Sequence, residues 1–174
     1  FKPQTVNLRL QGINKYLEFI KQDKLKVKFV KVQQKNFLEN VISDADYKFR
    51  ADSSFFYLTG FAEPEAVAII ETFESIDEGY TYSLFCRERD REMEIWHGYR
   101  AGVDGAVEDY DADEAYAIDL LDEEILSKIT HCDVLYYCIA HSSAFDARVS
   151  TWLDKIKQSR QLEAPKKLQS LDRI

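Results

Sequence analysis

The sequence predicts an α/β domain in which helices cover both faces of a mixed β-sheet. Segments with the apolar spacing of helices lie near both ends of the 174-residue chain, whereas segments with strand-like patterns gather in its middle. Hydrophobic residues make up 45% of the chain, which is enough to bury the core of one domain of this size. Helices that alternate with strands at both ends of a central group of strands favour a mixed sheet covered by helices.

The first two predicted elements are a helix and a strand. Apolar residues recur at intervals of three and four between Val6 and Ile20, which is the stripe of an amphipathic helix. Residues 24–32 then read KLKVKFVKV, in which apolar side chains alternate with lysines. Because successive side chains of a strand point to opposite faces, this pattern predicts a strand with one solvated face.

Three more strands are predicted in the middle of the chain. Residues 55–61, FFYLTGF, are rich in aromatic and β-forming residues and are broken at Gly60, which predicts a short buried strand followed by a turn. Residues 66–70 form a continuous apolar run, and residues 80–86 are again rich in β-formers. Because a turn segment separates these two runs, we expect them to form a hairpin.

The second half of the chain is predicted to hold a long charged segment, two helices and another strand. Residues 87–119 are charged and contain glycines, so we expect mostly loop with short elements, and loops of this length are usually functional or disordered. Apolar stripes over 121–129 and 145–156 predict helices, and 134–139 predicts a buried strand between them. The predicted core includes Phe55, Tyr57, Val67, Ile69, Val134, Val149 and Leu153.

Charge and cysteine usage narrow the class of function. The net charge is -8 and the pI is near 5.0, so long-range repulsion argues against nucleic acid or an anionic membrane as a partner. No apolar run in the sequence has the length of a membrane span. An odd number of cysteines, 3, without CxxC spacing, favours reduced thiols over a disulfide framework. We therefore expect a cytoplasmic protein.

The sequence contains neither of the spacings that commonly bind zinc, HExxH and CxxC. His131, Cys132 and Cys138 come nearest to a zinc set. A strand over 134–139 would place the two thiols ~20 Å apart at a rise of ~3.3 Å per residue, so the strand cannot bring them to one metal. We interpret these cysteines as buried thiols, since free cysteine behaves as a small hydrophobic residue.

Three other patterns imitate functional motifs. Aspartates alternate over 109–113 as in a calcium loop, but Glu114 and Leu120 occupy the positions that require glycine and a bidentate glutamate. Residues 141–143, His-Ser-Ser, put a base beside hydroxyls, yet the nucleophile-elbow motif GxSxG is missing and a loop or helix N-cap is favoured. The arginines of 87–91 could bind an anion, but acidic residues interleave with them and favour an ion-paired surface.

Two longer strings resemble the N-terminal domain of aminopeptidase P. The first is DADYKFRADSSFFYLTGFAEPEAVAII at 44–70, and the second is LFCRERDREMEIWHGYRAG at 84–102. In the family, a YLTGF-x-EPEA string precedes an EIW-x-G-x-R-x-G string at about this separation. The resemblance covers roughly 44–174 and implies the α/β fold of the creatinase and prolidase N-terminal domain. Asp111 and Ala117 depart from the glycine and proline that the family often has at these positions.

The resemblance implies that this chain is one part of a larger peptidase. It assigns 1–164 to the N-terminal domain and 165–174 to a linker toward a C-terminal catalytic domain that this chain lacks. That domain would hold two divalent metal ions, usually manganese, and would remove the residue that precedes proline at the second position of a peptide. This chain would then hold no catalytic residue and no metal. Its expected partners are its own catalytic domain, further copies in a homo-oligomer and the peptide.

Within the second string, the resemblance singles out Trp96 and Arg100. The family places the matching residues near the mouth of the active site, where they sometimes reach a neighbouring subunit. A tryptophan ring offers broad contact area and an arginine can anchor a carboxylate, so both are candidates for the substrate pocket or an interface. Packing onto the core is the alternative for Trp96. For the whole chain, the alternatives are a standalone binding or regulatory module and the N-terminal domain of a prolidase-type or creatinase-type enzyme.

Overall fold

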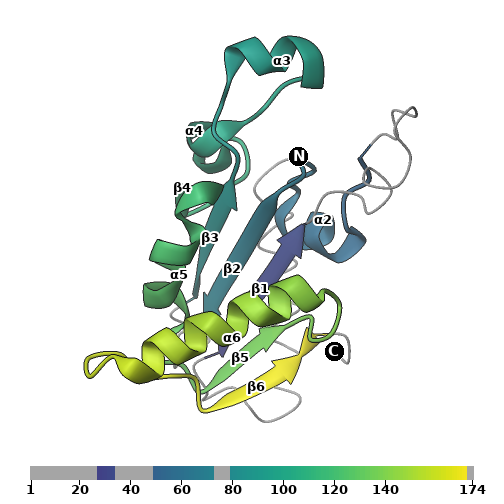
Figure 1. Ribbon diagram of the computed structural model, residues 1–174. Coiled ribbons are helices and arrows are strands. Elements are labelled where there is room, and N and C mark those ends of the chain that lie inside the picture. Colours follow the sequence, from purple (N-terminus) through teal and green to yellow (C-terminus); the bar gives the residue numbers. More distant parts are fainter. Residues whose placement is uncertain (1–26, 34–48, 73–78, 172–174) are drawn as a thin grey trace.

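The computed structural model describes residues 27–33, 49–72 and 79–171, and these residues form a six-stranded sheet with helices packed on it (Figure 1). The strand order is β4-β3-β2-β1-β5-β6. In chain order, the described elements are β1 (Val27–Gln33), α2 (Ser53–Thr59), β2 (Ala66–Thr72), β3 (Tyr80–Cys86), α3 (Arg91–His97), α4 (Gly102–Glu108), β4 (Glu114–Ala117), the 3₁₀ turn η3 (Ile118–Leu120), α5 (Leu121–Ile129), β5 (Val134–Tyr137), α6 (Ser143–Gln158) and β6 (Lys167–Ser170).

The sheet is mixed because its strands pair in both directions. β2 is antiparallel to β1 and to β3, and the pairing with β3 confirms the predicted hairpin. β4 joins β3, β5 joins β1 and β6 joins β5 in parallel. Parallel neighbours need a crossover connection, and helices supply it: α3 and α4 lie between β3 and β4, and α6 lies between β5 and β6.

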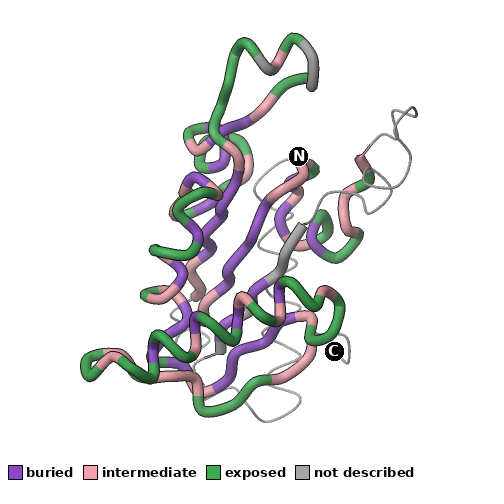
Figure 2. Tube along the Cα trace, in the orientation of Figure 1, coloured by how far each residue is buried: buried purple, intermediate pink, exposed green. Residues whose placement is uncertain are grey.

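Helices cover both faces of the sheet, as the sequence predicts. On one face, Ala66, Ala68 and Ile70 of β2 share a buried cluster with residues of α2 and α4. Val67 and Ile69 point the other way, because strand side chains alternate, and they pack with α5 and α6 in a second cluster. Figure 2 shows buried segments running along the central strands between these two layers. The predicted fold class is confirmed.

The segment predicted as a strand over 55–61 is instead the helix α2. The Asp52 carboxylate accepts a hydrogen bond from the Phe55 backbone N–H at 2.7 Å, which caps the first turn. Gly60 then ends the helix in the left-handed conformation with φ of +72°. Capping at both ends outweighs the β-preference of the aromatic side chains. On a helix, residues two apart point in different directions, so Phe55 is buried whereas Tyr57, a predicted core residue, is 59% exposed.

The remaining core predictions hold with one exception. The buried face of α6 is a regular stripe, and Leu153 lies beside it, half-buried, because it follows the buried Trp152 directly and so points about 100° further around the helix. Trp152 also donates its indole N–H to the Asp122 carboxylate at 2.6 Å, which fixes α6 against α5. The predicted core residues that are buried are Phe55, Val67, Ile69, Val134 and Val149.

The sheet ends in an edge strand that the sequence does not predict. β6 is made of exposed and half-buried residues and pairs with β5. β6 lies inside 165–174, the range predicted to be a linker. Because β6 pairs with β5, residues Lys167–Ser170 are part of the sheet. β5 ends at Tyr137 and not at 139. The predicted N-terminal helix over 6–20 lies outside the described residues.

Candidate functional site: the arm between β3 and α4

The chain leaves the sheet at the end of β3 and returns to the domain at the start of α4. We call residues 87–101 the arm. Its central element is α3, which lies beyond the end of β3, away from the other helices (Figure 1). The sequence predicts mostly loop with short elements over 87–119. Short elements are present, since α3, α4 and β4 fall within this range and η3 begins in it, and together they leave less loop than predicted.

Both predicted site residues lie in the arm. Trp96 belongs to α3, and its side chain lies outside the part of the chain that the structure describes. Ile95, beside it, is 80% exposed, so α3 presents apolar surface to solvent. Arg100 lies on the returning segment and is half-buried, and its Nε is buried without a hydrogen-bond partner among the described residues. The structure thus places the two residues in one segment and leaves their roles as predictions.

A carboxylate within the arm ties its outgoing and returning segments together. Glu94 Oε1 accepts a hydrogen bond from Arg89 Nε at 3.1 Å and another from the Arg100 backbone N–H at 3.2 Å. The Glu94 side chain is only 18% exposed. The Arg100 N–H, and after it the Arg89 guanidinium, holds the pKa of Glu94 below its usual range. Glu94 therefore stays ionised near neutral pH and keeps both bonds charge-assisted.

A second carboxylate also links the outgoing and returning segments, at the base of the arm. Glu63, in the loop before β2, accepts a hydrogen bond from the Ala101 backbone N–H at 2.7 Å through Oε1. Its other oxygen lies 3.7 Å from Arg87 Nη2, and its side chain is 14% exposed. Arg100 and Ala101 are consecutive, so two successive backbone N–H groups are each bound by a glutamate that also pairs with an arginine of the outgoing segment. We call Glu63, Arg87, Arg89 and Glu94 the clasp.

The clasp is packed against the first residue of α4. Gly102 has φ of +67°, and a Cβ built on it would lie 2.8 Å from Arg89 Cβ. A residue with a side chain would therefore push Arg89 away from this position. On its other side, the Arg89 guanidinium carbon lies 5.3 Å from the centre of the Tyr99 ring, within cation–π range. Arg89 is thus fixed from three directions, by Glu94, Gly102 and Tyr99.

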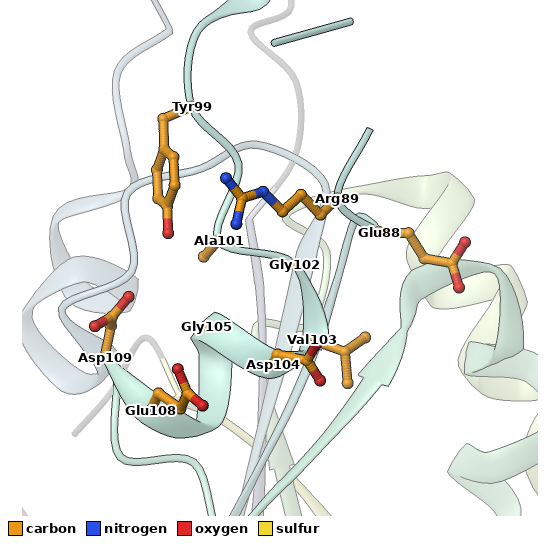
Figure 3. Close-up of a pocket in the computed structure, with 10 residues that line it drawn as sticks. All are labelled: Glu88, Arg89, Tyr99, Ala101, Gly102, Val103, Asp104, Gly105, Glu108 and Asp109. Carbon is orange, nitrogen blue, oxygen red and sulfur yellow. The ribbon is translucent and has the colours of Figure 1, made fainter. Parts of the chain in front are cut away.

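Two open cavities flank the base of the arm. One, of about 410 Å³, lies over α4, and Figure 3 shows Arg89 and Tyr99 above this helix, which carries the acidic side chains of Asp104 and Glu108 and has Asp109 at its end. The other, of about 580 Å³, is lined by arginines of the arm, including Arg100, together with acidic residues and the segment around Ile118. The mixed charge of both linings suits polar contacts with a peptide or a protein surface.

The described part of the chain contains no group of three or more His, Cys, Asp or Glu side chains that could hold a metal ion. The two metal ions that the family implies therefore find no donor set among these residues. Burial raises the pKa of the Cys86 thiol to about 12 and that of Cys132 to about 11, so neither is a thiolate nucleophile near neutral pH. None of the described helices has the length and apolar character of a membrane span.

The other motif-like patterns serve the fold. The Ser142 hydroxyl accepts the Phe145 N–H at 3.3 Å and caps α6, in agreement with the N-cap interpretation. The Asp113 carboxylate accepts the Tyr82 N–H at 2.7 Å, which joins it to β3. Arg87 and Arg89 are ion-paired, but their partners are Glu63 and Glu94 and not the acidic residues that interleave with them in the sequence. Glu63 and Glu94 are not singled out by sequence reasoning, although both stand inside the two strings that carry the family resemblance.

Comparison with known proteins agrees with this resemblance. The family described as "Aminopeptidase P, N-terminal domain" matches residues 23–136. The Xaa-Pro aminopeptidase of Escherichia coli K12 is 37% identical over 125 residues, which cover 71% of this chain and 28% of that protein. The structure of Pseudomonas aeruginosa aminopeptidase PepP superposes with a TM-score of 0.78 at 35% identity, over 95% of this chain and 36% of the other. Zinc-substituted E. coli aminopeptidase P in complex with product gives 0.80 at 29% identity, over 98% and 37%.

The chain spans about a third of the length of these relatives, or less. The matched range contains β1, α2, β2, β3, the arm, α4, β4 and α5, so the family assignment includes the clasp and both candidate site residues. The match covers well over half of the sequence and is supported independently by structural similarity along nearly its whole length. This chain therefore belongs to the aminopeptidase P N-terminal domain family.

Proposed function

We propose that this chain is the non-catalytic N-terminal domain of a metal-dependent aminopeptidase that removes the N-terminal residue preceding proline. The observation that carries the proposal is the family match over 23–136, together with relatives named Xaa-Pro aminopeptidase. In this proposal the chemistry belongs to a C-terminal domain, and the present chain supports it.

The proposed support has two parts, pocket shape and assembly. Trp96 and Arg100 lie in the arm, where an aromatic ring could cover a bound peptide and a guanidinium could anchor a carboxylate. Such contacts hold a peptide in position and contribute to the rate without supplying an acid or a base. The exposed Ile95 on α3 offers apolar area for contact with another copy of the chain in a homo-oligomer.

The metal belongs to the proposed catalytic domain. The relative that was solved with zinc in place of its usual metal, and with product bound, supports a metal-dependent hydrolase. We propose two divalent ions there, with manganese as the usual metal, since a pair of metals can activate a water and stabilise the leaving group. We also propose that the protein is cytoplasmic, and the thiols of Cys86 and Cys132, which are not in disulfides, agree with a reducing compartment.

The proposal is tested with the full-length protein that carries this domain and with the 174-residue chain alone. After loading with manganese, the full-length protein should release the first residue of Xaa-Pro-Xaa tripeptides and leave Xaa-Ala-Xaa tripeptides intact. The domain alone should hydrolyse neither and should carry far less than one equivalent of manganese or zinc. Turnover by the isolated chain, or a full-length protein that prefers Xaa-Pro dipeptides, would contradict it; the second outcome would instead favour a prolidase.

A further inference from the structure

We propose that Glu63 and Glu94 are positioning residues that fix the direction of the arm, and through it the location of Trp96 and Arg100 at the peptide pocket. This inference rests on the proposed function, because it names the residues that make the pocket contribution of this domain possible. Neither glutamate is placed to touch a reacting atom. Their role is to hold a short projecting segment in one orientation.

The geometry of the clasp supports this role. The returning segment presents the N–H groups of Arg100 and Ala101 one after the other, and each is bound by a carboxylate from a different part of the chain. Glu94 comes from α3 itself, whereas Glu63 comes from the loop before β2 and so belongs to the body of the domain. One glutamate therefore closes the arm on itself and the other attaches it to the sheet. Together they restrict both bending within the arm and rotation at its base.

The two carboxylates of the clasp are better shielded from solvent than those of a surface ion pair, although the Arg89 side chain is 48% exposed. Exposed ion pairs contribute little because solvent screens them and long side chains lose freedom. Here the carboxylates of Glu63 and Glu94 are only 14% and 18% exposed, and each binds a backbone N–H in addition to an arginine. A backbone N–H cannot move away without moving the chain, so these bonds fix the path of the backbone directly.

The backbone hydrogen bonds of α3 do not hold the arm against the sheet in the way that the clasp does. α3 has seven residues, and its ends are closed by its own backbone bonds, from Glu94 N–H to Asp90 C=O at 2.9 Å and from Gly98 N–H to Glu94 C=O at 3.0 Å. These bonds keep the turn helical but do not connect it to the sheet. Gly98 has φ of +81°, and a Cβ built on it would have nothing within 4 Å, so no packing contact restrains the chain on that side of the residue. Misplacement of a contact residue by about 1 Å can lower a rate by about a hundredfold.

The two hydrogen bonds to Glu94 end on the same oxygen, and this makes the substitution series informative. Glu94→Gln keeps a carbonyl oxygen that can accept both bonds and loses only the charge. Glu94→Ala removes the acceptor altogether. Glu92→Ala is the matched control, since Glu92 is an exposed acid on the same helix and the structure describes no bond from its carboxylate to Arg89 or Arg100.

The test is a double-substitution cycle in the manganese-loaded full-length protein. Values of kcat/KM are measured on Xaa-Pro peptides of three and of six residues for wild type, Glu94→Ala, Trp96→Ala and the double variant. We expect Glu94→Ala to lower kcat/KM on the longer peptide by about tenfold, and Glu94→Gln to lower it less. In a protein that already carries Trp96→Ala, adding Glu94→Ala should lower kcat/KM by less than about twofold. Glu92→Ala should show no coupling to Trp96.

A second readout reports the arm without using activity. Hydrogen exchange of the peptide containing Arg100 and Ala101 should be faster in Glu94→Ala and in Glu63→Ala by about tenfold or more, and close to wild type in Glu92→Ala. Melting temperatures and manganese content should stay near the wild-type values in all variants that are compared.

Two outcomes would overturn the inference even if the wild-type enzyme cleaves Xaa-Pro peptides as proposed. The first is that the losses of kcat/KM from Glu94→Ala and Trp96→Ala simply add in the double variant. The second is that hydrogen exchange at Arg100 and Ala101 does not change in Glu94→Ala and Glu63→Ala. A full-length wild type that cleaves no Xaa-Pro peptide would overturn the proposed function, and this inference with it. In that case the exchange data would still decide whether the clasp holds the arm. The outcomes therefore separate a wrong pocket assignment from a wrong account of how the arm is positioned.

Discussion

Gly102 joins the arm to α4 at a point where the chain has no room for a side chain. Its φ of +67° is unfavourable for other residues, and an added Cβ would lie 2.8 Å from Arg89 Cβ. Gly60, at the end of α2, has a similar φ of +72° but nothing within 4 Å of its own added Cβ. The two glycines thus separate the cost of the backbone conformation from the cost of crowding Arg89.

We expect Gly60→Ala to lower the free energy of unfolding by about 1 kcal/mol, the cost of a left-handed conformation in a residue with a side chain. Gly102→Ala should cost at least about 1 kcal/mol more, because it adds a clash to the same strain. Urea unfolding of both variants measures the difference. Equal losses in the two variants would show that Arg89 moves aside freely and is not held by the clasp.

Sequence reasoning identifies the charged character of the arm but not its pairing. The interleaved acids and arginines of 87–92 predict an ion-paired surface, and Arg87 and Arg89 are paired, but with glutamates that lie outside this range. Glu63, however, is 38 residues from Ala101 along the chain, and its contact with that N–H exists only once β2 and β3 form the hairpin. A partner fixed by tertiary structure leaves no spacing signal in the sequence.

At the scale of the element, an apolar stripe predicts a helix reliably when one face of that helix is buried. Residue preferences alone are misleading when capping residues determine whether a short segment is a helix or a strand. The stripe predicted over 121–129 is α5, and its Leu121, Ile125 and Ile129 are 0% exposed. The aromatic run at 55–61 reads as a strand, yet the Asp52 cap and Gly60 make it α2. In α6 the predicted stripe is correct but broader than the buried face, so the predicted core contains Leu153, which is half-buried, and omits Ile156, which is fully buried.

The difference within α6 can be measured. Ile156 is fully buried, so Ile156→Ala should lower the free energy of unfolding by about 2 to 5 kcal/mol through lost burial and the cavity left behind. Leu153 is half-buried at the edge of the same cluster, and Leu153→Ala should cost less than Ile156→Ala. Denaturant unfolding of the two variants, which are matched in helix and in substitution type, gives both values. A larger loss for Leu153→Ala would place the core on the wrong side of α6.

At the scale of the whole molecule, the sequence predicts the helical layers on the two faces of the sheet better than it predicts the strands at the edges of the sheet. The order of predicted strands and helices along the chain, with the helical periodicity of 121–129 and 145–156, is sufficient to predict helices on both faces of a mixed sheet. β6 has four residues, all exposed or half-buried, and therefore has neither an apolar run nor an alternating pattern. Its place in the sheet follows from pairing with β5, a contact between segments that α6 separates. Short edge strands of this kind cannot be predicted from local pattern alone.

The function, like the fold, is only partly predictable from local sequence pattern. Residue chemistry in this chain predicts no catalytic constellation, and the site candidates come from the EIW-x-G-x-R string and the family that it resembles. In the structure this string lies in the arm, where Glu94 and Glu63 accept hydrogen bonds from the backbone N–H groups of Arg100 and Ala101. We propose that these bonds position the candidate site residues. In this account the domain contributes shape to a reaction that takes place elsewhere.

The kinetics of a Trp96→Ala variant of the full-length, manganese-loaded protein test this account most directly. The measurement is kcat/KM on Xaa-Pro peptides of increasing length, with metal content and melting temperature recorded for the same preparations. We predict a lower kcat/KM on the longer peptides, because the ring positions the peptide, with metal content and melting temperature equal to wild type. Wild-type kinetics at every peptide length in a fully folded, fully metallated variant would contradict the account and leave Trp96 with a packing role only.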